Sequence, residues 1–317
     1  MKNCVFILPY FGKFKNYFPL FLKSCEKNKS FDWLIITDCK VEYNYPSNVI
    51  VKYISFTDWK EHIEKKFDFK LNLDAPYKLC DYKPSYGYIL EDKISNYEYR
   101  GYCDCDLLFG DLEKLLIPLM KKGYDKIFAA GHLTLYKNNY DNNRRFMKTI
   151  YNRCIYKEVL SVREIKAFDE DLGGNNIHSI FLDDSASVFS DDLSANPSVA
   201  KSQFHLMKYD PNRRLFIEQS YKVSAFFWNN GKILEFYDNN GTLVTKEYLY
   251  MHLQMRNMSY SNRLLECESV QILPNVFIAQ KIPFSLAEFK KIKKTNFNRQ
   301  QFDLMVVRIK RKFKKFH

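Results

Sequence analysis

The chain has 317 residues, of which 46% are hydrophobic and 27% charged, and its formal net charge is +12. This length suits one large α/β domain or two modest ones, and the apolar content excludes a disordered or fibrous chain. No apolar run approaches the roughly eighteen residues of a membrane-spanning helix. Residues 4–22 are rich in apolar side chains but are interrupted by prolines and lysines, and no small-residue cleavage site follows, so we do not expect a signal peptide.

The positive charge is concentrated at the C-terminus. Residues 289–317 contain eleven Lys and Arg against the single acid Asp303, so ten of the twelve net charges lie there. The nearly neutral remainder argues against a nucleic-acid surface spread over the fold. In the tail, apolar side chains alternate with cations, which is typical of a basic amphipathic helix that docks on anionic lipid. A solvated helix, an oligomer contact and an RNA contact are the alternatives for this segment.

The eight cysteines are scattered through the chain without the paired spacing of a metal site. Cys103 and Cys105 are two residues apart on one expected strand, where a disulfide between them would be strained. This pattern favours a reduced, cytoplasmic protein.

The N-terminal region alternates strands with a helix. We expect buried strands at 4–9, 32–38 and 49–55, with an amphipathic helix that begins near Pro19. This rhythm is typical of a βαβ unit and a mostly parallel sheet. Ligands of such sheets bind beyond the carboxyl ends of the strands. The residues expected there are Pro9, Tyr10, Phe11, Gly12 and Asp38.

Further along the chain, the pattern predicts a helix after Pro84, a strand that runs into Asp104, and a strand segment over 126–138 broken at Gly131. Asn-Gly pairs at 230–231 and 240–241 bracket a strand and indicate a hairpin. The periodicity after Thr245 predicts a helix. We expect one catalytic domain over 1–288 and a basic tail over 289–317.

The strongest local motif is Asp104-Cys105-Asp106, which follows an apolar strand. Carboxylates at i and i+2 of an extended chain point to the same side. Two like charges there are costly unless a cation joins them, and oxygen ligands suit Mg²⁺ or Mn²⁺. The alternative is an exposed turn that holds two acids by chance.

Three segments in this order, LPYFG, CDYKPSYGYIL and YEYRGYCDCDLLFGDL, resemble the GT-A glycosyltransferases of bacterial capsule and surface-polysaccharide synthesis. The elements that carry the resemblance are Lys83-Pro84-Ser85-Tyr86-Gly87, the DxD motif and the later His252-Leu253-Gln254-Met255-Arg256. It covers most of residues 1–260 and implies a Rossmann-like α/β fold with a mostly parallel central sheet and flanking helices.

The resemblance also implies a nucleotide-sugar donor, expected to be a UDP-hexose, over the carboxyl edge of the sheet. Asp104 and Asp106 would hold a divalent metal on the diphosphate. Asp38 would bind the uracil or ribose, or else act as a simple turn acid. Lys83 would contact phosphate, or else be a solvated lysine at a helix start. Asp81 and Tyr86 belong to the same donor-binding group.

Transferases of this fold often take a third metal ligand from a downstream histidine. We favour His252, with His205 as the second choice, whereas His132 is expected on the acceptor side. On the predicted helix, Arg256 at i+4 would share a face with His252 and meet a phosphate. A lone histidine is more often a packed or surface residue than a ligand.

An inverting enzyme also needs a carboxylate base for the acceptor hydroxyl. We nominate Asp169, with Glu170 as the alternate, from the acidic segment before Gly173-Gly174. This segment has a second interpretation as an acidic surface turn, and a retaining enzyme would need no such base.

The hypothesis is therefore a metal-dependent glycosyltransferase that acts on a saccharide acceptor, expected to be lipid-linked, at the inner face of the cell membrane. The alternatives are a nucleic-acid-binding protein that acts through the tail, and a nucleotidyltransferase or phosphotransferase that uses the paired acids. No Walker-type glycine loop or kinase motif supports the last of these.

Overall fold

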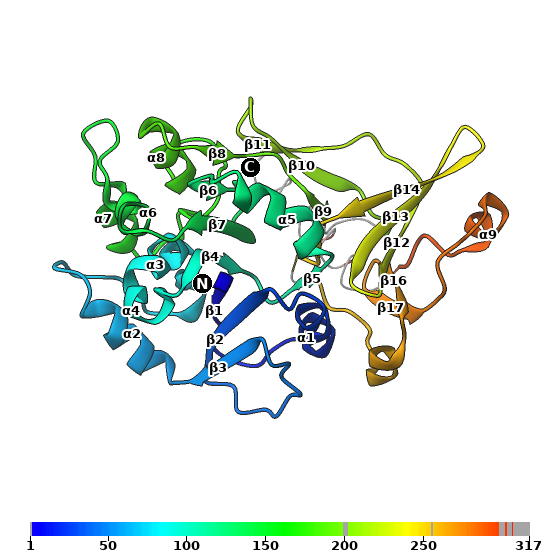
Figure 1. Ribbon diagram of the computed structural model, residues 1–317, viewed down its shortest axis with the longest axis horizontal. Helices are drawn as coiled ribbons and strands as arrows, with labels where there is room; N and C mark the ends of the chain where they lie inside the picture. Colours follow the sequence, from blue (N-terminus) through cyan, green and yellow to red (C-terminus); the bar gives the residue numbers. More distant parts are fainter. Residues whose placement is uncertain (1, 199–201, 255, 298–301, 303–305, 307–317) are drawn as a thin grey trace.

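The structure is a computed structural model that describes residues 2–198, 202–254, 256–297, 302 and 306. Its centre is a sheet of seven strands in the order β3-β2-β1-β4-β7-β6-β8 (Figure 1). The strands of this sheet are β1 (Lys2–Pro9), β2 (Phe31–Thr37), β3 (Val49–Tyr53), β4 (Tyr97–Cys103), β6 (Lys126–Ile127), β7 (Leu133–Lys137) and β8 (Val188–Phe189). β1 to β4 are mutually parallel, while β7 pairs antiparallel with β4 and β6. The prediction of an α/β fold with a mostly parallel central sheet is confirmed.

Both faces of this sheet are covered, which explains the unbroken apolar run of β1. Cys4, Phe6 and Leu8 face one core, which includes the buried side of α1 (Phe18–Glu26). Val5 and Ile7 face the other core, which η1 and several helices complete. The helices of the sheet region are α1, α2 (Phe56–Glu64), η1 (Pro76–Ser85), α3 (Tyr86–Ile89), α4 (Glu91–Ile94), α5 (Leu112–Lys121), α6 (Tyr140–Arg144), η2 (Arg145–Met147), α7 (Ile155–Leu160) and α8 (Ile177–Asp183).

Two further sheets of five strands extend the molecule, and the third sheet lies at the end opposite α7 and α8 (Figure 1). The second sheet has the order β11-β10-β9-β15-β5, with β5 (Leu107–Phe109), β9 (Ser194–Pro197), β10 (Leu206–Asp210), β11 (Leu215–Glu218) and β15 (Tyr250–His252). The third has the order β14-β13-β12-β16-β17, with β12 (Ser224–Asn229), β13 (Lys232–Asn239), β14 (Thr242–Tyr248), β16 (Ser269–Leu273) and β17 (Val276–Ala279). The helix η3 (Asn262–Glu266) precedes β16.

The helix predicted from Thr245 is wrong, because this region forms β14 and β15. Asn240 and Gly241 both have positive φ, at 52° and 87°. Such a pair forms a tight hairpin turn, so the chain after it must pair with β13. Residues Thr242 to Tyr248 do so in antiparallel register. The turn chemistry therefore overrides the weaker helical periodicity.

The described part of the C-terminal region contains α9 (Leu286–Lys291), which spans the predicted boundary at residue 288. Phe289 is buried against Phe227 and Phe236 of the third sheet. Phe284 and Phe297 are exposed. Most of the predicted amphipathic helix, namely 298–301, 303–305 and 307–317, lies outside the described residues, so the tail over 289–317 stays a prediction. None of the described helices is both long and apolar enough to cross a membrane.

Candidate active site

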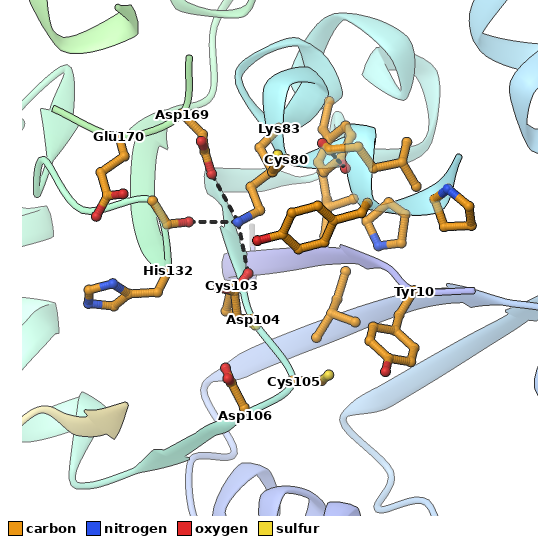
Figure 2. Close-up of a pocket in the computed structure, with 18 of the residues that line it drawn as sticks. Tyr10, Cys80, Lys83, Cys103, Asp104, Cys105, Asp106, His132, Asp169 and Glu170 are labelled. Atoms are coloured by element: carbon orange, nitrogen blue, oxygen red, sulfur yellow. Dashed lines mark hydrogen bonds and ion pairs between the residues drawn. The ribbon is translucent and has the colours of Figure 1, made fainter. Parts of the chain in front are cut away.

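A cavity of about 630 Å³ lies at the carboxyl ends of β1 and β4 (Figure 2). This is the edge of the sheet where the parallel arrangement predicts a ligand. Eleven residues predicted from the sequence line the cavity: Pro9, Tyr10, Phe11, Lys83, Tyr86, Asp104, Asp106, His132, Asp169, Glu170 and His252. Five predicted residues are not among its lining: Gly12, Asp38, Asp81, His205 and Arg256.

Two carboxylates and one imidazole converge on one side of the cavity. One ligand atom from each of Asp104, Asp106 and His252 lies within 4.8 Å of the others. His252 Nε2 is 3.6 Å from Asp106 Oδ1. Burial lowers the pKa of His252 to about 3, so the ring is neutral and its nitrogen is able to coordinate. Two carboxylates and a neutral imidazole fit Mn²⁺ or Mg²⁺ and leave room for phosphate oxygens and water.

The pairing of two short strands brings His252 to the DxD motif. After β4 the chain crosses Asp104–Asp106 and enters β5, which pairs antiparallel with β15. In this register His252 is the partner of Leu107, the residue after Asp106. The amide of Leu253 also donates to the carbonyl of Asp106 at 2.9 Å. The histidine therefore reaches the site from a strand, and not from the predicted helix.

Lys83 links the two acidic sides of the cavity (Figure 2). Its Nζ donates to Asp104 Oδ1 and to the carbonyl of Gly131, each at 2.8 Å, and lies 3.0 Å from Asp169 Oδ2. Burial opposes the charged form, but Asp104 and Asp169 raise the pKa of Lys83 well above its ordinary value. The lysine is therefore a cation between two carboxylates, and its contact with phosphate stays a prediction.

The wall facing the DxD motif contains the two nominated bases. Burial raises the pKa of Asp169 to about 6, although Lys83 opposes this shift. Burial and the neighbouring Asp169 raise the pKa of Glu170 to about 7. A carboxylate with a pKa near neutrality is well matched to proton transfer. Of the two, Asp169 forms the ion pair with Lys83, which makes Glu170 the better candidate base.

Several lining residues were not expected from the sequence, among them Tyr77, Cys80, Gly131 and Ile165. A Cβ on Gly131 would lie 2.9 Å from Asp169 Oδ2 and 3.0 Å from Glu170 Cβ, so a larger residue there would displace these two acids. The break at Gly131 in an otherwise apolar strand was the one available signal. Tyr77 and Ile165 lie on segments without a motif, which gave no signal.

Gly12 and Asp38 contact each other outside the cavity lining. The amide of Gly12, whose φ is +101°, donates to Asp38 Oδ1 at 2.7 Å. This contact braces the loop that carries Tyr10 and Phe11 into the cavity. A contact of Asp38 with a nucleotide stays a prediction.

Asp81 and Arg256 are buried in the protein interior. Asp81 has no exposed surface and pairs with Lys78 at 2.8 Å. Arg256 is 1% exposed, and its guanidinium donates to the carbonyls of Leu253 and Pro197 at 3.0 and 3.2 Å. Because His252 lies on β15 and the described residues 253, 254 and 256 are not helical, the predicted shared helical face of His252 and Arg256 is wrong.

The other histidines that we considered differ in their surroundings. His132 lines the cavity and stacks on His252 with ring centroids 4.2 Å apart. His205 contacts Glu218 at 2.7 Å and stacks on Tyr221. Among the described residues, Asp104 and Asp106 form a possible metal-binding cluster with one histidine, and of the three histidines considered this is His252.

A comparison with curated proteins gives no match. Two similar solved structures are crystal structures of the galactosyltransferase LgtC, one in complex with donor and acceptor sugar analogues and one of an active-site mutant. The first is 10% identical over 62% of this chain and 76% of the other, and the second is 13% identical over 67% and 81%, both with a TM-score of 0.35. Similarity at this level assigns neither an activity nor a substrate. The sequence of residues 6–281, in contrast, matches one family along most of the chain, and the protein therefore belongs to DUF6625, a family of unknown function.

Proposed function

We propose that the protein is a metal-dependent glycosyltransferase that moves a hexose from a UDP-sugar to a saccharide acceptor. The observation that carries this proposal is the convergence of Asp104, Asp106 and His252 in a cavity of about 630 Å³ at the carboxyl edge of the parallel strands. A cavity of this volume is of the size that small-molecule and cofactor sites have.

The charges of the lining support a metal requirement. Asp104, Asp106 and Asp169 are acidic, and the ammonium of Lys83 is already shared between two of them. A nucleoside diphosphate would add further negative charge to the same place. A bound Mn²⁺ or Mg²⁺ supplies the neutralisation that the departing diphosphate needs.

The remaining lining residues have separate roles in this proposal. Tyr10 and Phe11 bind the base and ribose end of the donor beside β1. Glu170, with Asp169 as the alternate, accepts the proton of the acceptor hydroxyl at a carboxylate oxygen if the reaction inverts the anomeric centre. Lys83 keeps Asp169 and Asp104 at fixed separation.

For the acceptor we propose a lipid-linked saccharide of capsule or surface-polysaccharide synthesis, met at the cytoplasmic face of the membrane. The eleven Lys and Arg of residues 289–317 support a contact with anionic lipid. The full chain should co-sediment with phosphatidylserine vesicles, and deletion of 289–317 should abolish this co-sedimentation. Salt-sensitive RNA binding by the same segment, with no affinity for nucleotide sugars, would instead support the nucleic-acid alternative.

A thermal-shift screen of nucleotides and nucleotide sugars, with and without Mn²⁺, tests the activity. At a hundred times its dissociation constant a ligand stabilises the native state by about 2.7 kcal/mol. We expect UDP to raise the melting temperature only when the metal is present, and Asp106→Asn to remove this response. Consumption of nucleoside triphosphates in place of nucleotide sugars would favour a nucleotidyltransferase or phosphotransferase.

A further inference from the structure

The nominated bases lie on a segment without regular secondary structure. We call residues 164–170 the strap, which follows α7. Its members Ile165 and Ala167 line the cavity. So do Asp169 and Glu170, which Figure 2 shows beside Lys83. Ala167 has a positive φ of 50°. Because the strap itself forms no helix or strand, the amides of Lys166 and Phe168 have no partner in a helical or sheet ladder of their own, and buried amides need partners from elsewhere in the chain.

A buried ion pair on η1 supplies these partners. Asp81 Oδ1 accepts from the amide of Phe168 at 2.9 Å, and Asp81 Oδ2 accepts from the amide of Lys166 at 3.0 Å. Lys78 Nζ donates to the carbonyls of Glu164 and Val159 at 2.7 and 3.0 Å. The pair therefore binds the strap backbone in two ways: Asp81 accepts from its amides, and Lys78 donates to the carbonyl of Glu164.

The same short helix also reaches the end of the strap. Lys78 and Asp81 are three residues apart on η1, and Lys83 follows two residues later. Side chains at i and i+3 of a 3₁₀ helix lie above one another, which brings Lys78 and Asp81 together. Lys83 then contacts Asp169, the residue after Phe168, and Asp104. A continuous series of contacts thus runs from Asp81 through the strap to the DxD motif.

We infer that Lys78 and Asp81 are positioning residues. Their contacts with the strap backbone hold Asp169 and Glu170 at the cavity wall that faces the cluster of Asp104, Asp106 and His252. This inference rests on the proposed function for its catalytic consequence. It replaces the nucleotide contact expected of Asp81, whose side chain has no exposed surface. The oxygen atoms of Asp81, and not its charge, perform this role, because backbone amides need an acceptor.

Two double variants separate the acceptor from the charge. Lys78→Met with Asp81→Asn removes both charges but keeps one carbonyl oxygen. At the position of Oδ1 this oxygen accepts from both strap amides, since Phe168 N lies 2.9 Å and Lys166 N 3.3 Å from Oδ1. Lys78→Met with Asp81→Leu removes the charges and the acceptor together. Neither leaves a buried unpaired charge, which is the usual reason why single substitutions of such pairs unfold proteins.

Hydrogen exchange measures the structural part of this inference without any substrate. We expect the amides of Lys166 and Phe168 to exchange at least about tenfold faster in the Leu variant than in the Asn variant, because only the first lacks an acceptor. Equal protection of both amides in the two variants would overturn the inference.

Turnover measures the catalytic part, with Mn²⁺-dependent hydrolysis of a UDP-sugar as the assay. We expect the Leu variant to lose about tenfold or more in kcat, as supporting residues of a site typically do, and the Asn variant to recover most of it. Binding of UDP with Mn²⁺ should stay within about twofold of the unmodified chain in both, because the metal ligands lie on β15 and after β4. A Leu variant with full kcat would also overturn the inference.

Asp32→Asn is the matched control, since Asp32 is a buried acid that accepts from Tyr97 at the opposite end of the central strands. It should lower stability without changing kcat. The two failures are distinguishable: an unmodified chain that neither binds UDP with Mn²⁺ nor hydrolyses UDP-sugars contradicts the proposed function. In that case hydrogen exchange at Lys166 and Phe168 still decides whether the pair holds the strap.

Discussion

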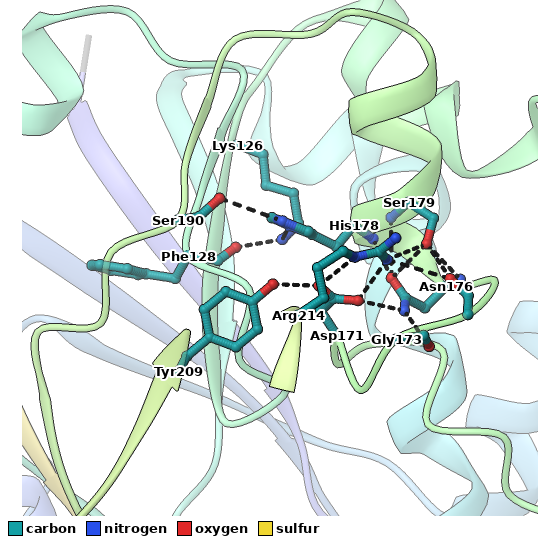
Figure 3. A network of polar contacts seen from close by, with 11 residues as sticks. Lys126, Phe128, Asp171, Gly173, Asn176, His178, Ser179, Ser190, Tyr209 and Arg214 are labelled. Carbon is teal, nitrogen blue, oxygen red and sulfur yellow. Dashed lines mark hydrogen bonds and ion pairs between the residues drawn. The ribbon is translucent and has the colours of Figure 1, made fainter. Parts of the chain in front are cut away.

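Three consecutive acids, Asp169, Glu170 and Asp171, enter two different polar regions of the molecule. Asp169 and Glu170 face the cavity. Asp171 instead bonds to Asn176, Tyr209 and Arg214, a group that we call the closed network (Figure 3). Asp171 accepts two hydrogen bonds from Arg214, at 2.6 and 2.9 Å, and one from Asn176 at 2.8 Å. The hydroxyl of Tyr209 donates to it as well.

The two regions shift carboxyl pKa values in opposite directions. Burial alone would raise the pKa of Asp171, but hydrogen bonds from Arg214, Tyr209 and Asn176 lower it to about 2. In the cavity, burial outweighs the available partners and raises the pKa of Asp169 to about 6 and that of Glu170 to about 7. A carboxylate surrounded by donors is committed to structure, while one with few donors beside a cavity retains the capacity to bind a cation or a proton.

A second buried pair belongs to the structural region. Lys126 Nζ lies 3.1 Å from His178 Nδ1 and also donates to the carbonyl of Phe128 (Figure 3). Burial lowers the pKa of Lys126 to about 7 and that of His178 to about 3. The sides of β6 and α8 are joined by this contact, and the network of Asp171 joins α8 to the β10–β11 hairpin. The Asp171 network therefore anchors the chain directly after Glu170.

The largest expected effect is on the cavity side. Asp106→Asn should reduce Mn²⁺-dependent turnover of a UDP-sugar by about a thousandfold or more, because it removes a charged metal ligand that the neutral amide replaces poorly. Turnover assays and the UDP thermal shift over a Mn²⁺ series measure this. Asp171→Asn is the matched control from the closed network, and its metal dependence should equal that of the unmodified chain. Unchanged activity and metal dependence in Asp106→Asn would end the glycosyltransferase proposal.

The next effect tests the proton-accepting role of Glu170. Because the base must be ionised, turnover should rise with pH through about 7 and then level off. Glu170→Gln should remove this limb and lower kcat by about a hundredfold. Stability should run the other way: a carboxyl with a raised pKa favours the native state at low pH, and this contribution is lost as pH rises through about 7.

The pH–rate profile of the Gln variant, set beside that of the unmodified chain, is the deciding measurement. A variant with full kcat and the same profile would contradict the assignment. That result would be expected of a retaining enzyme, which needs no carboxylate base.

How far the sequence predicted this site depends on the kind of signal each residue left. Asp104 and Asp106 were found because an acid pair after an apolar strand is visible in the sequence, and the carboxyl-edge rule added Tyr10 and Phe11. His252 was predicted through the family resemblance, but the helix predicted to carry it is wrong, because His252 lies on β15. Its true position depends on the β5–β15 pairing, a contact between segments about 145 residues apart that no local pattern encodes.

The contacts that Lys83 and Asp81 make within the protein could not be predicted from the sequence, for a related reason. Whether a charged residue faces a ligand or another side chain depends on tertiary partners. Lys83 meets Asp104 and Asp169, and Asp81 meets the strap backbone 85 residues away, only once the chain is folded. The mostly parallel character of the central sheet, in contrast, could be predicted from the local alternation of strands and helices.

The smallest of these effects concerns the closed network itself. Asp171→Asn leaves Arg214 without its counter-charge, and since that arginine is partly exposed we expect a loss of only about 2 kcal/mol in the free energy of unfolding at pH 7. An acid whose pKa is lowered contributes stability above its ordinary pKa, and this contribution is lost as pH falls toward about 2. Urea unfolding of both chains at several pH values should therefore show a difference that shrinks below pH about 4. Asp92→Asn, in an exposed pair with Lys93, should change stability by less than about 0.5 kcal/mol. If the Asp171 and Asp92 variants lost equal stability, the distinction between a closed structural network and an ordinary surface acid would fail.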